Sequence, residues 1–459
     1  MNKADLELCQ ALVEEAQQLG AHSADAMMGR SSDFDVTVRD GKIEEVSRAT
    51  DATLGIRVFL TADKGRKLGF LTTSALPTDK TERAGLLKRA LGMAEASAAT
   101  PFHGLPDPAD TNLSTIPSPA LDLYDPRVAE LDPAWALAAS LEMEKVARAT
   151  EPRIHTFASV GAGAGRGEVA YVNSNGFSGQ FEGTHVNAYC SAVTLHNGNR
   201  QSDGWSDAQR HVGDLMPPQE IARKAAQRVG RAVGAKPGPT GTFPVIFEAP
   251  VAMSIIGHIA AGVSGDLLAK NATYLQHKRG QKIAPDFFQL VDDATVPRAF
   301  GSMPFDGEGL ATRVNPLVTN GVLQGFLYDA FTARRLNARP TGSARRGPGS
   351  LPDIGTGNIR LTAGKKPLAE LIKDAGRGLL VTRMLGHGPD MVTGDYSRGA
   401  AGLWFENGEI VHPVEEMTVA GNLTDMLLAI SAVGADLLVR GGTACPSIAF
   451  SQLAVSSRA

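Results

Sequence analysis

The chain has few cysteines and no long uninterrupted apolar segment. Its 459 residues contain three widely spaced cysteines, Cys9, Cys190 and Cys445. Such an odd, scattered set does not form a disulfide framework, which favours a reducing compartment and a cytoplasmic protein. No stretch approaches the roughly 18 consecutive apolar residues of a membrane-spanning helix. Residues 1–20 carry Asp and Glu among their apolar positions, unlike a signal peptide.

A strong net charge is also missing. The chain has 45 Lys and Arg residues and 49 Asp and Glu residues, so its formal net charge is −4. This balance disfavours nucleic acid as the main partner, because a polycationic surface is absent. Five arginines do gather in one segment, but no aromatic residues interleave them to stack bases. We interpret this group as a solvated loop face: Arg334, Arg335, Arg339, Arg345 and Arg346.

The composition is that of an ordinary globular protein, with 43% hydrophobic and 20% charged residues. Apolar spacing predicts helices, and alternating segments joined by Asp-Gly and Asn-Gly turns predict antiparallel strands. Strands joined by hairpins, with helices grouped apart, indicate an α+β fold. The Pro- and Gly-rich segment 236–241 predicts a boundary between two domains, 1–236 and 237–459, each with a mainly antiparallel sheet and a few helices. The predicted helices are 3–19, about 81–97, 133 onward, 218–235, 251–264, 367–376 and 425–433.

Other segments are predicted to be irregular or only shortly structured. Residues 101–127 contain six prolines and are expected to form a long surface loop, and short strands are expected over 153–210. The glycine-rich run 161–167, GAGAGRG, resembles a dinucleotide-binding loop only superficially, because that loop must open a helix and strand-like EVAYVNSNG follows here. A glycine-rich loop or bulge is the better interpretation.

Three residue groups are candidates for chemistry. In FDGEG (305–309), Asp306 and Glu308 pair two carboxylates that suit acid–base work, although an ordinary turn explains the pattern better. His258 lies in the predicted helix 251–264, where the positions three to five residues away supply no strong ligand, so a packed histidine is favoured. Cys445 is either a ligand or a nucleophile, yet no base is identifiable, and a structural cysteine is favoured.

Several ordered blocks of the chain closely resemble the TldD/PmbA family, and specifically its PmbA (TldE) branch. They are IIGHIAAGVSGDLLAKNATYL (255–275), FGSMPFDGEGLATR (300–313), LYDAFTARRLNARPTGSARR (327–346), TGDYSRGAAGLWFENGEIVHPVEEMTVAGNL (393–423) and GADL (434–437). The resemblance covers most of the chain and is strongest from about residue 244 onward.

The resemblance implies that the metal site of the family is degenerate here. In the TldD branch, this helix carries His-Glu-x-x-x-His, whose glutamate acts as general base on a zinc-bound water. Aligned on Gly265-Asp266, the three motif positions hold Ile256, Gly257 and Ala261. The resemblance therefore implies no catalytic residue and no metal in this chain, with zinc in a TldD-type partner.

The resemblance also implies a heteromeric peptidase that acts on unfolded or extended peptides, with roles such as microcin-type leader removal and antitoxin turnover. Backbone pairing with an exposed strand would suit such substrates, and the candidate peptide-binding residues are Thr393, Gly394, Asp395, Ser397 and Arg398. The isolated chain could form a homodimer. Two alternatives stay open: a stand-alone homo-oligomeric peptide-binding protein, and an independent peptidase with a metal site built from His258, Cys445 and Asp306.

Overall fold

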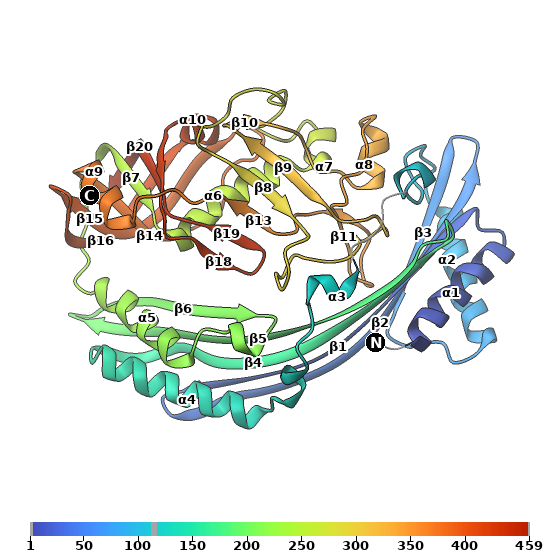
Figure 1. Cartoon of the computed structure of the whole chain (residues 1–459), viewed down its shortest axis with the longest axis horizontal. Helices are drawn as coiled ribbons and strands as arrows, with labels where there is room; N and C mark the ends of the chain where they lie inside the picture. Colours follow the sequence, from blue (N-terminus) through green and yellow to red (C-terminus); the bar gives the residue numbers. More distant parts are fainter. Residues whose placement is uncertain (1–2, 112–116, 458–459) are drawn as a thin grey trace.

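The computed structural model describes residues 3–111 and 117–457. The N-terminal part is built on a six-stranded sheet in the order β3-β2-β1-β4-β5-β6, in which every neighbouring pair is antiparallel. Its long, curved strands extend beneath the C-terminal part (Figure 1). The strands are β1 (Ser23–Arg39), β2 (Lys42–Ala62), β3 (Gly65–Thr73), β4 (Ile154–Asn173), β5 (Ser178–His196) and β6 (Asn199–Gln209).

Four helices cover one face of this sheet. Ala24, Ala26 and Met28 of β1 pack with α1 (Lys3–Gln18) and α2 (Lys80–Ala96). Further along the same strand, Val36 and Val38 pack with α4 (Pro133–Thr150) and α5 (Pro218–Arg231). Because side chains alternate along a strand, the odd-numbered residues of β1 point to the opposite face, toward the C-terminal part. This second face carries polar and charged groups.

The C-terminal part holds a second six-stranded sheet, in the order β16-β15-β14-β7-β20-β17. An additional pairing between β16 and β20 closes five of its strands into a small barrel. Of its pairs, β7 and β14 run parallel, and the others are antiparallel. The strands are β7 (Gly241–Phe247), β14 (Gly378–Leu385), β15 (Asp395–Glu406), β16 (Glu409–Asn422), β17 (Ile430–Val433) and β20 (Ile448–Ser457).

A third sheet and several short helices complete the C-terminal part. The third sheet has the order β10-β9-β8-β13-β19-β18, and β11 pairs separately with β12. Its strands are β8 (Leu290–Asp293), β9 (Val314–Thr319), β10 (Val322–Leu323), β13 (Ile359–Leu361), β18 (Leu438–Arg440) and β19 (Thr443–Cys445), beside β11 (Ala344–Arg345) and β12 (Asp353–Ile354). The helices are α6 (Ala249–Gly262), α7 (Gly265–Ala269), α8 (Ala330–Arg335), α9 (Leu368–Ala375) and α10 (Leu423–Leu428).

The predicted α+β class is confirmed: helices and mostly antiparallel sheets are grouped as expected. Asn407 and Gly408 turn between β15 and β16 with φ of 52° and 77°, the left-handed geometry that favours Asn-Gly in hairpins. The division at residue 236 stays a prediction. Within the described residues, no helix has both the length and the apolarity needed to cross a membrane.

Three local predictions were wrong, and a fourth was incomplete. The strands over 153–210 are long rather than short, and GAGAGRG is regular strand within β4, paired on both sides. Its glycines make room for neighbours: a Cβ on Gly165 would stand 2.0 Å from Asp33 Oδ1. The predicted helix 425–433 ends at Leu428, because β17 pairs with β20. The predicted loop 101–127 contains α3 (Ser118–Leu121) and two 3₁₀ turns, while 112–116 lie outside the described residues.

Candidate functional site

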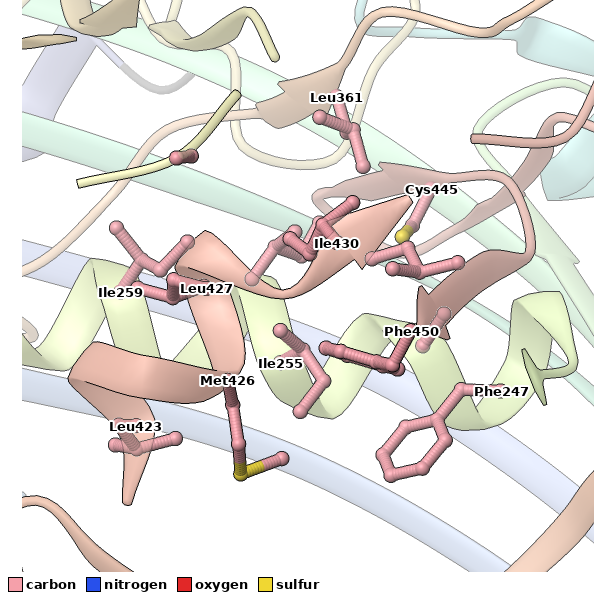
Figure 2. Close-up of a cluster of buried hydrophobic side chains, with 14 of the residues drawn as sticks. Phe247, Ile255, Ile259, Leu361, Leu423, Met426, Leu427, Ile430, Cys445 and Phe450 are labelled. Carbon is pink, nitrogen blue, oxygen red and sulfur yellow. The ribbon is translucent and has the colours of Figure 1, made fainter. Parts of the chain in front are cut away.

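Helix α6 is embedded in the largest apolar cluster of the C-terminal part. Proline lies in its first turn, and small and aliphatic residues predominate after it, so most of its surface is apolar. Ile255 and Ile259 pack against side chains from α10, β17 and β20 (Figure 2). The helix is therefore held by core packing rather than by polar contacts.

The three positions of the family's metal motif lie on different sides of α6. Ile256 is fully buried, whereas Gly257 and Ala261 are exposed. A step of five residues turns an α-helix by about 500°, which leaves two such positions roughly 140° apart. None of the three side chains offers a metal ligand. That they mark a lost metal motif stays a prediction.

The other residues considered as ligands do not complete a metal site. Cys445 of β19 is fully buried in the same apolar cluster, its Sγ lies 3.2 Å from the Pro446 carbonyl oxygen, and burial raises the pKa of its thiol. In the ranges 3–111 and 117–457, no three His, Cys, Asp or Glu side chains are grouped as a metal site requires. The donors that surround α6 therefore do not fit a zinc ion, which needs three or four convergent ligands.

His258 of α6 does meet the predicted peptide-binding segment. Its ring packs edge-on against Tyr396 with a centroid distance of 6.1 Å. Burial, and secondly the charge of Arg398, lowers the pKa of His258 to about 4, so the ring is neutral at physiological pH. His258 Nε2, Tyr396 Oη and Arg398 Nε are all buried without a hydrogen-bond partner among the described residues. Such groups are rare in folded proteins, and each requires an explanation.

The peptide-binding candidates lie where β15 extends beyond β14. Residues 395–398 pair with β16 on one side, but β14 joins the other side only from Gly399 onward. The backbone carbonyl oxygen of Asp395 accepts a hydrogen bond from the Asp390 N–H on the side away from β16. Since backbone groups alternate in direction along a strand, those of Ser397 also point to the side that no described strand covers.

The turn before this strand is firmly held. Asn422 Nδ2 donates to the Thr393 carbonyl oxygen at 2.9 Å, and Gly394 takes a φ of 82°. A Cβ at Gly394 would stand 3.1 Å from the Asn422 side chain. These contacts give Thr393 and Gly394 a structural role, and peptide binding by the five candidates stays a prediction.

A second constellation lies on the charged face of the N-terminal sheet. Asp25 of β1 and Arg57 of β2 stand directly opposite each other, and Arg57 Nε donates to Asp25 Oδ2 at 2.9 Å. Arg346 Nη1 donates to Asp25 Oδ1 at 3.0 Å, and Tyr171 Oη donates to Asp25 Oδ2 at 3.0 Å. The side chains of Asp25 and Arg346 are fully buried. Although burial opposes it most strongly, Arg346 and Arg57 lower the pKa of Asp25.

This constellation corrects the interpretation of the arginine-rich segment as a solvated face. The Arg346 guanidinium is buried and joins the C-terminal part to β1. Arg334 Nη1 donates to the carbonyl oxygens of Phe102 and Gly104, at 3.3 and 3.2 Å. These partners lie more than 200 residues away in the sequence, so local composition did not reveal them.

The carboxylates of FDGEG adjoin this constellation. Asp306 Oδ1 accepts hydrogen bonds from the N–H groups of Glu308 and Leu310, at 2.9 and 3.0 Å, as expected for a turn. Glu308 Oε2 accepts from Ala330 N–H at 2.8 Å, and its Oε1 lies 3.6 Å from Arg57 Nη1. Burial raises the pKa of Asp306 to about 6 and that of Glu308 to about 7. The prediction of a turn was correct, but it missed two buried carboxylates.

A cavity of about 230 Å³ opens over Glu308, between β2 and β3 on one side and α7 and α8 on the other. Pockets that combine apolar walls with a few convergent polar groups are the usual form of small-molecule sites. The sequence offered one signal for it: an acidic pair flanked by the apolar residues Phe305 and Leu310.

Comparisons with known proteins agree over nearly the whole chain. Models described as PmbA/TldA metallopeptidase domain 1, central domain and C-terminal domain match residues 24–98, 126–233 and 240–457. The metalloprotease PmbA of Escherichia coli is 29% identical, over 99% of this chain and 98% of that protein. The PmbA homologue of Haemophilus influenzae is 32% identical, over 97% and 94%.

Solved structures show the same arrangement. A Bacteroides thetaiotaomicron protein, described as a candidate modulator of DNA gyrase, superposes with a TM-score of 0.90 at 25% identity and covers 100% of both chains. TldE from Thermococcus kodakarensis superposes with a TM-score of 0.86 at 23% identity, over 98% of this chain and 100% of that one. This second likeness concerns the fold alone.

Proposed function

Because the chain belongs to the TldD/PmbA family of metallopeptidases, we propose that it is a subunit without its own zinc site in a heteromeric TldD/TldE-type peptidase. The assembly would degrade or mature unfolded peptides in the cytoplasm, and the zinc would reside in a TldD-type partner. One observation carries the proposal: the α6 positions that align with the metal motif hold Ile256, Gly257 and Ala261, and among the described residues no group of His, Cys, Asp or Glu side chains stands in for the missing ligands.

A long unpaired strand edge supports assembly with a partner. Residues 42–51 of β2 are exposed, and β3 pairs with β2 only from Leu54 onward. Two aliphatic side chains, Ile43 and Val46, are each 53% exposed on this segment. An uncovered edge of this length readily pairs with another chain. We therefore propose the outer side of residues 42–51 as a contact for the partner subunit.

The open end of β15 supports binding of extended peptides. The backbone N–H and C=O of Ser397 can pair with a peptide strand, beside Arg398 and the ring of His258. Recognition through the backbone would place little demand on the substrate's side chains. The chain would then contribute binding, while its partner contributes hydrolysis.

The first test measures metal and activity in the purified chain, alone and mixed with a TldD-type chain. We expect no stoichiometric zinc and little cleavage of an unstructured peptide from this chain alone, and cleavage that chelators abolish from the mixture. Stoichiometric zinc or chelator-sensitive cleavage by the isolated chain would refute the proposal. Peptide binding by this chain, with neither a complex nor cleavage after mixing with a TldD-type chain, would favour a stand-alone binding protein.

A second test addresses the two strand edges. Changing both Ile43 and Val46 to Lys should weaken assembly at least tenfold in sedimentation experiments, whereas Val439→Lys, at a valine 47% exposed on β18, should not. Ser397→Pro removes the N–H on the open side and should raise KM for peptide in the assembled complex. Ser397→Ala keeps that N–H and serves as the control. Equal KM values for the two Ser397 variants would exclude this edge.

A further inference from the structure

The cavity over Glu308 is a mostly apolar pocket between the two parts of the chain. Phe59 of β2 and Leu68 of β3 line it from the N-terminal part, and Phe331, Leu351 and Ile354 line it from the C-terminal part. Its volume of about 230 Å³ exceeds the roughly 150 Å³ of a cavity known to hold benzene. A linear or cyclic hydrocarbon group of six or seven carbons would therefore fit.

Carboxylates predominate among the polar groups of this cavity. Glu308, Asp329, Asp266 and Asp353 line it, against a single guanidinium, that of Arg57. Arg57 is already bonded to Asp25, which lies outside the cavity. His103 also lines the cavity, and burial lowers its pKa, so it contributes no charge at neutral pH. Because Asp266 is paired with Lys270 Nζ at 2.7 Å, the negative charge of the lining above pH 7 rests on Glu308, Asp329 and Asp353.

Two of these carboxylates are deeply buried and incompletely bonded. Glu308 is 2% exposed, and the cation facing its Oε1 is Arg57 Nη1, at 3.6 Å. Asp329 is 7% exposed; its Oδ1 accepts from Thr332 N and Oγ1, whereas no described residue donates to its Oδ2. This oxygen can therefore accept a hydrogen bond from a ligand in the cavity that Asp329 lines. The charge of Asp329 is close enough to raise the pKa of Glu308 further.

We propose that this cavity binds an alkylammonium group, with the ammonium between Glu308 and Asp329 and the carbon stem against Phe59, Phe331 and Leu351. A –NH₃⁺ group has three donors, enough for both carboxylates. The apolar walls match a stem of four to six methylenes. A lysine side chain and a free alkylamine share this chemistry. The site is distinct from α6 and from the open end of β15, so it does not depend on the proposed peptidase role.

Calorimetric titration with n-hexylammonium, 1-hexanol and hexanoate at pH 8 tests the charge preference. We expect n-hexylammonium to bind at least tenfold more tightly than 1-hexanol, and hexanoate not to bind. Glu308→Gln keeps the size of the side chain and should weaken n-hexylammonium binding at least tenfold while leaving 1-hexanol unchanged. Equal binding of amine and alcohol, or preference for hexanoate, would overturn the proposal.

A second variant tests the position of the site without changing any charge. Leu351 is 42% exposed at the cavity, so Leu351→Trp should fill the space without disturbing the core and should abolish n-hexylammonium binding. Leu437→Trp, at another leucine that is 42% exposed, is the matched control and should bind normally. Binding that survives Leu351→Trp would place the amine elsewhere and refute the assignment.

Titration of a blocked Gly-Lys-Gly tripeptide then distinguishes the two sources of the ammonium group. Tighter binding of the tripeptide than of n-hexylammonium identifies a lysine side chain as the ligand, and weaker binding identifies a free amine. Failure of both compounds to bind would refute the site.

Discussion

Helix α6 and the junction around Asp25 differ in the kind of side chain that they bury: α6 buries apolar side chains, and the junction buries charged ones. The family resemblance directs attention to α6, yet its motif positions are chemically inert and its buried face packs in an apolar cluster. At the junction, four ionisable side chains are buried next to one another: those of Asp25, Arg57, Arg346 and Glu308. The helix that the family resemblance marks and the place where ionisable groups are buried are therefore two different regions.

The difference also concerns cost. Burying an apolar helix face stabilises the folded chain. Burying an ion does so only if oppositely charged and hydrogen-bonding groups satisfy it completely. Asp25 has a complete set, with two guanidiniums and one hydroxyl. The carboxylates of Glu308 and Asp329 lack a complete set of such partners. Both line a cavity, which is the arrangement that a ligand site requires.

Removing the charge at the centre of the junction should have the largest effect. Asp25→Asn removes the counter-charge of Arg346 and the nearer of the two carboxylates that face Arg57, and breaking such a buried cluster costs about 3–5 kcal/mol. Urea denaturation should show this loss in the free energy of unfolding. Glu220→Gln removes the partner of Arg223 in an exposed ion pair and should cost less than about 0.5 kcal/mol. A loss below about 1 kcal/mol for Asp25→Asn would show that the junction contributes no more than a surface pair.

Glu308→Gln should change the pH dependence of stability. Burial holds the pKa of Glu308 at about 7 in the folded chain, above its usual value of 4.5. A raised pKa adds stability that is complete below the unfolded value and disappears as the pH rises through the folded value. The unfolding free energy of the native chain, relative to Glu308→Gln, should therefore fall by about 2–3 kcal/mol between pH 4.5 and pH 8.

Glu248→Gln is the control, because its effect on the pH dependence of stability should have the opposite sign. Burial opposes the shift, but ion pairs with Arg231 and Arg228 lower the pKa of Glu248. Its contribution to stability should be present above the unfolded pKa and be lost as the pH falls, so relative to Glu248→Gln the native chain should lose stability toward acid pH. If both variants shifted the pH profile in the same direction, the assignment of a raised pKa to Glu308 would be wrong.

Much of the fold was predictable because its signals are local. Alternating apolar residues, Asn-Gly turns and the Asp132 cap of α4 each act within a few residues. The length of β4 was not predictable, because Gly161 to Gly167 become strand only through pairing with β1 and β5. Likewise, Arg346 is buried by Asp25, which is 321 residues away.

The candidate site was predictable only where a motif marked it. The resemblance located Ile256, Gly257 and Ala261, and a turn was correctly expected at Asp306. The burial of Glu308 depends on Arg57 of another sheet, and the meeting of His258 with Tyr396 depends on how α6 packs against β15. Neither contact can be predicted from the residues that are near it in the sequence.

The same substitution in the two regions should have opposite consequences. Tyr171 Oη donates to a buried carboxylate, so Tyr171→Phe should lower stability by about 1.5–3 kcal/mol. Tyr396 Oη is buried without a partner among the described residues, so Tyr396→Phe should leave stability unchanged or raise it by up to about 1 kcal/mol. Chemical denaturation of both variants tests the pair. A comparable loss for Tyr396→Phe would reveal an ordered water or ligand that bridges Tyr396, His258 and Arg398.

The smallest expected effect tests whether α6 requires a small residue at Gly257, one of the positions that align with the metal motif. Gly257 is helical and exposed, and a Cβ there would meet nothing within 4 Å. Gly257→Ala should therefore raise the free energy of unfolding by about 0.5–1 kcal/mol, because alanine loses less backbone entropy on folding. At Gly262, a Cβ would stand 2.8 Å from Tyr274 and 3.0 Å from Leu275, so Gly262→Ala should instead destabilise by about 1–3 kcal/mol. A loss of stability for Gly257→Ala would mean that something covers this face of α6 in solution, such as a second copy of the chain.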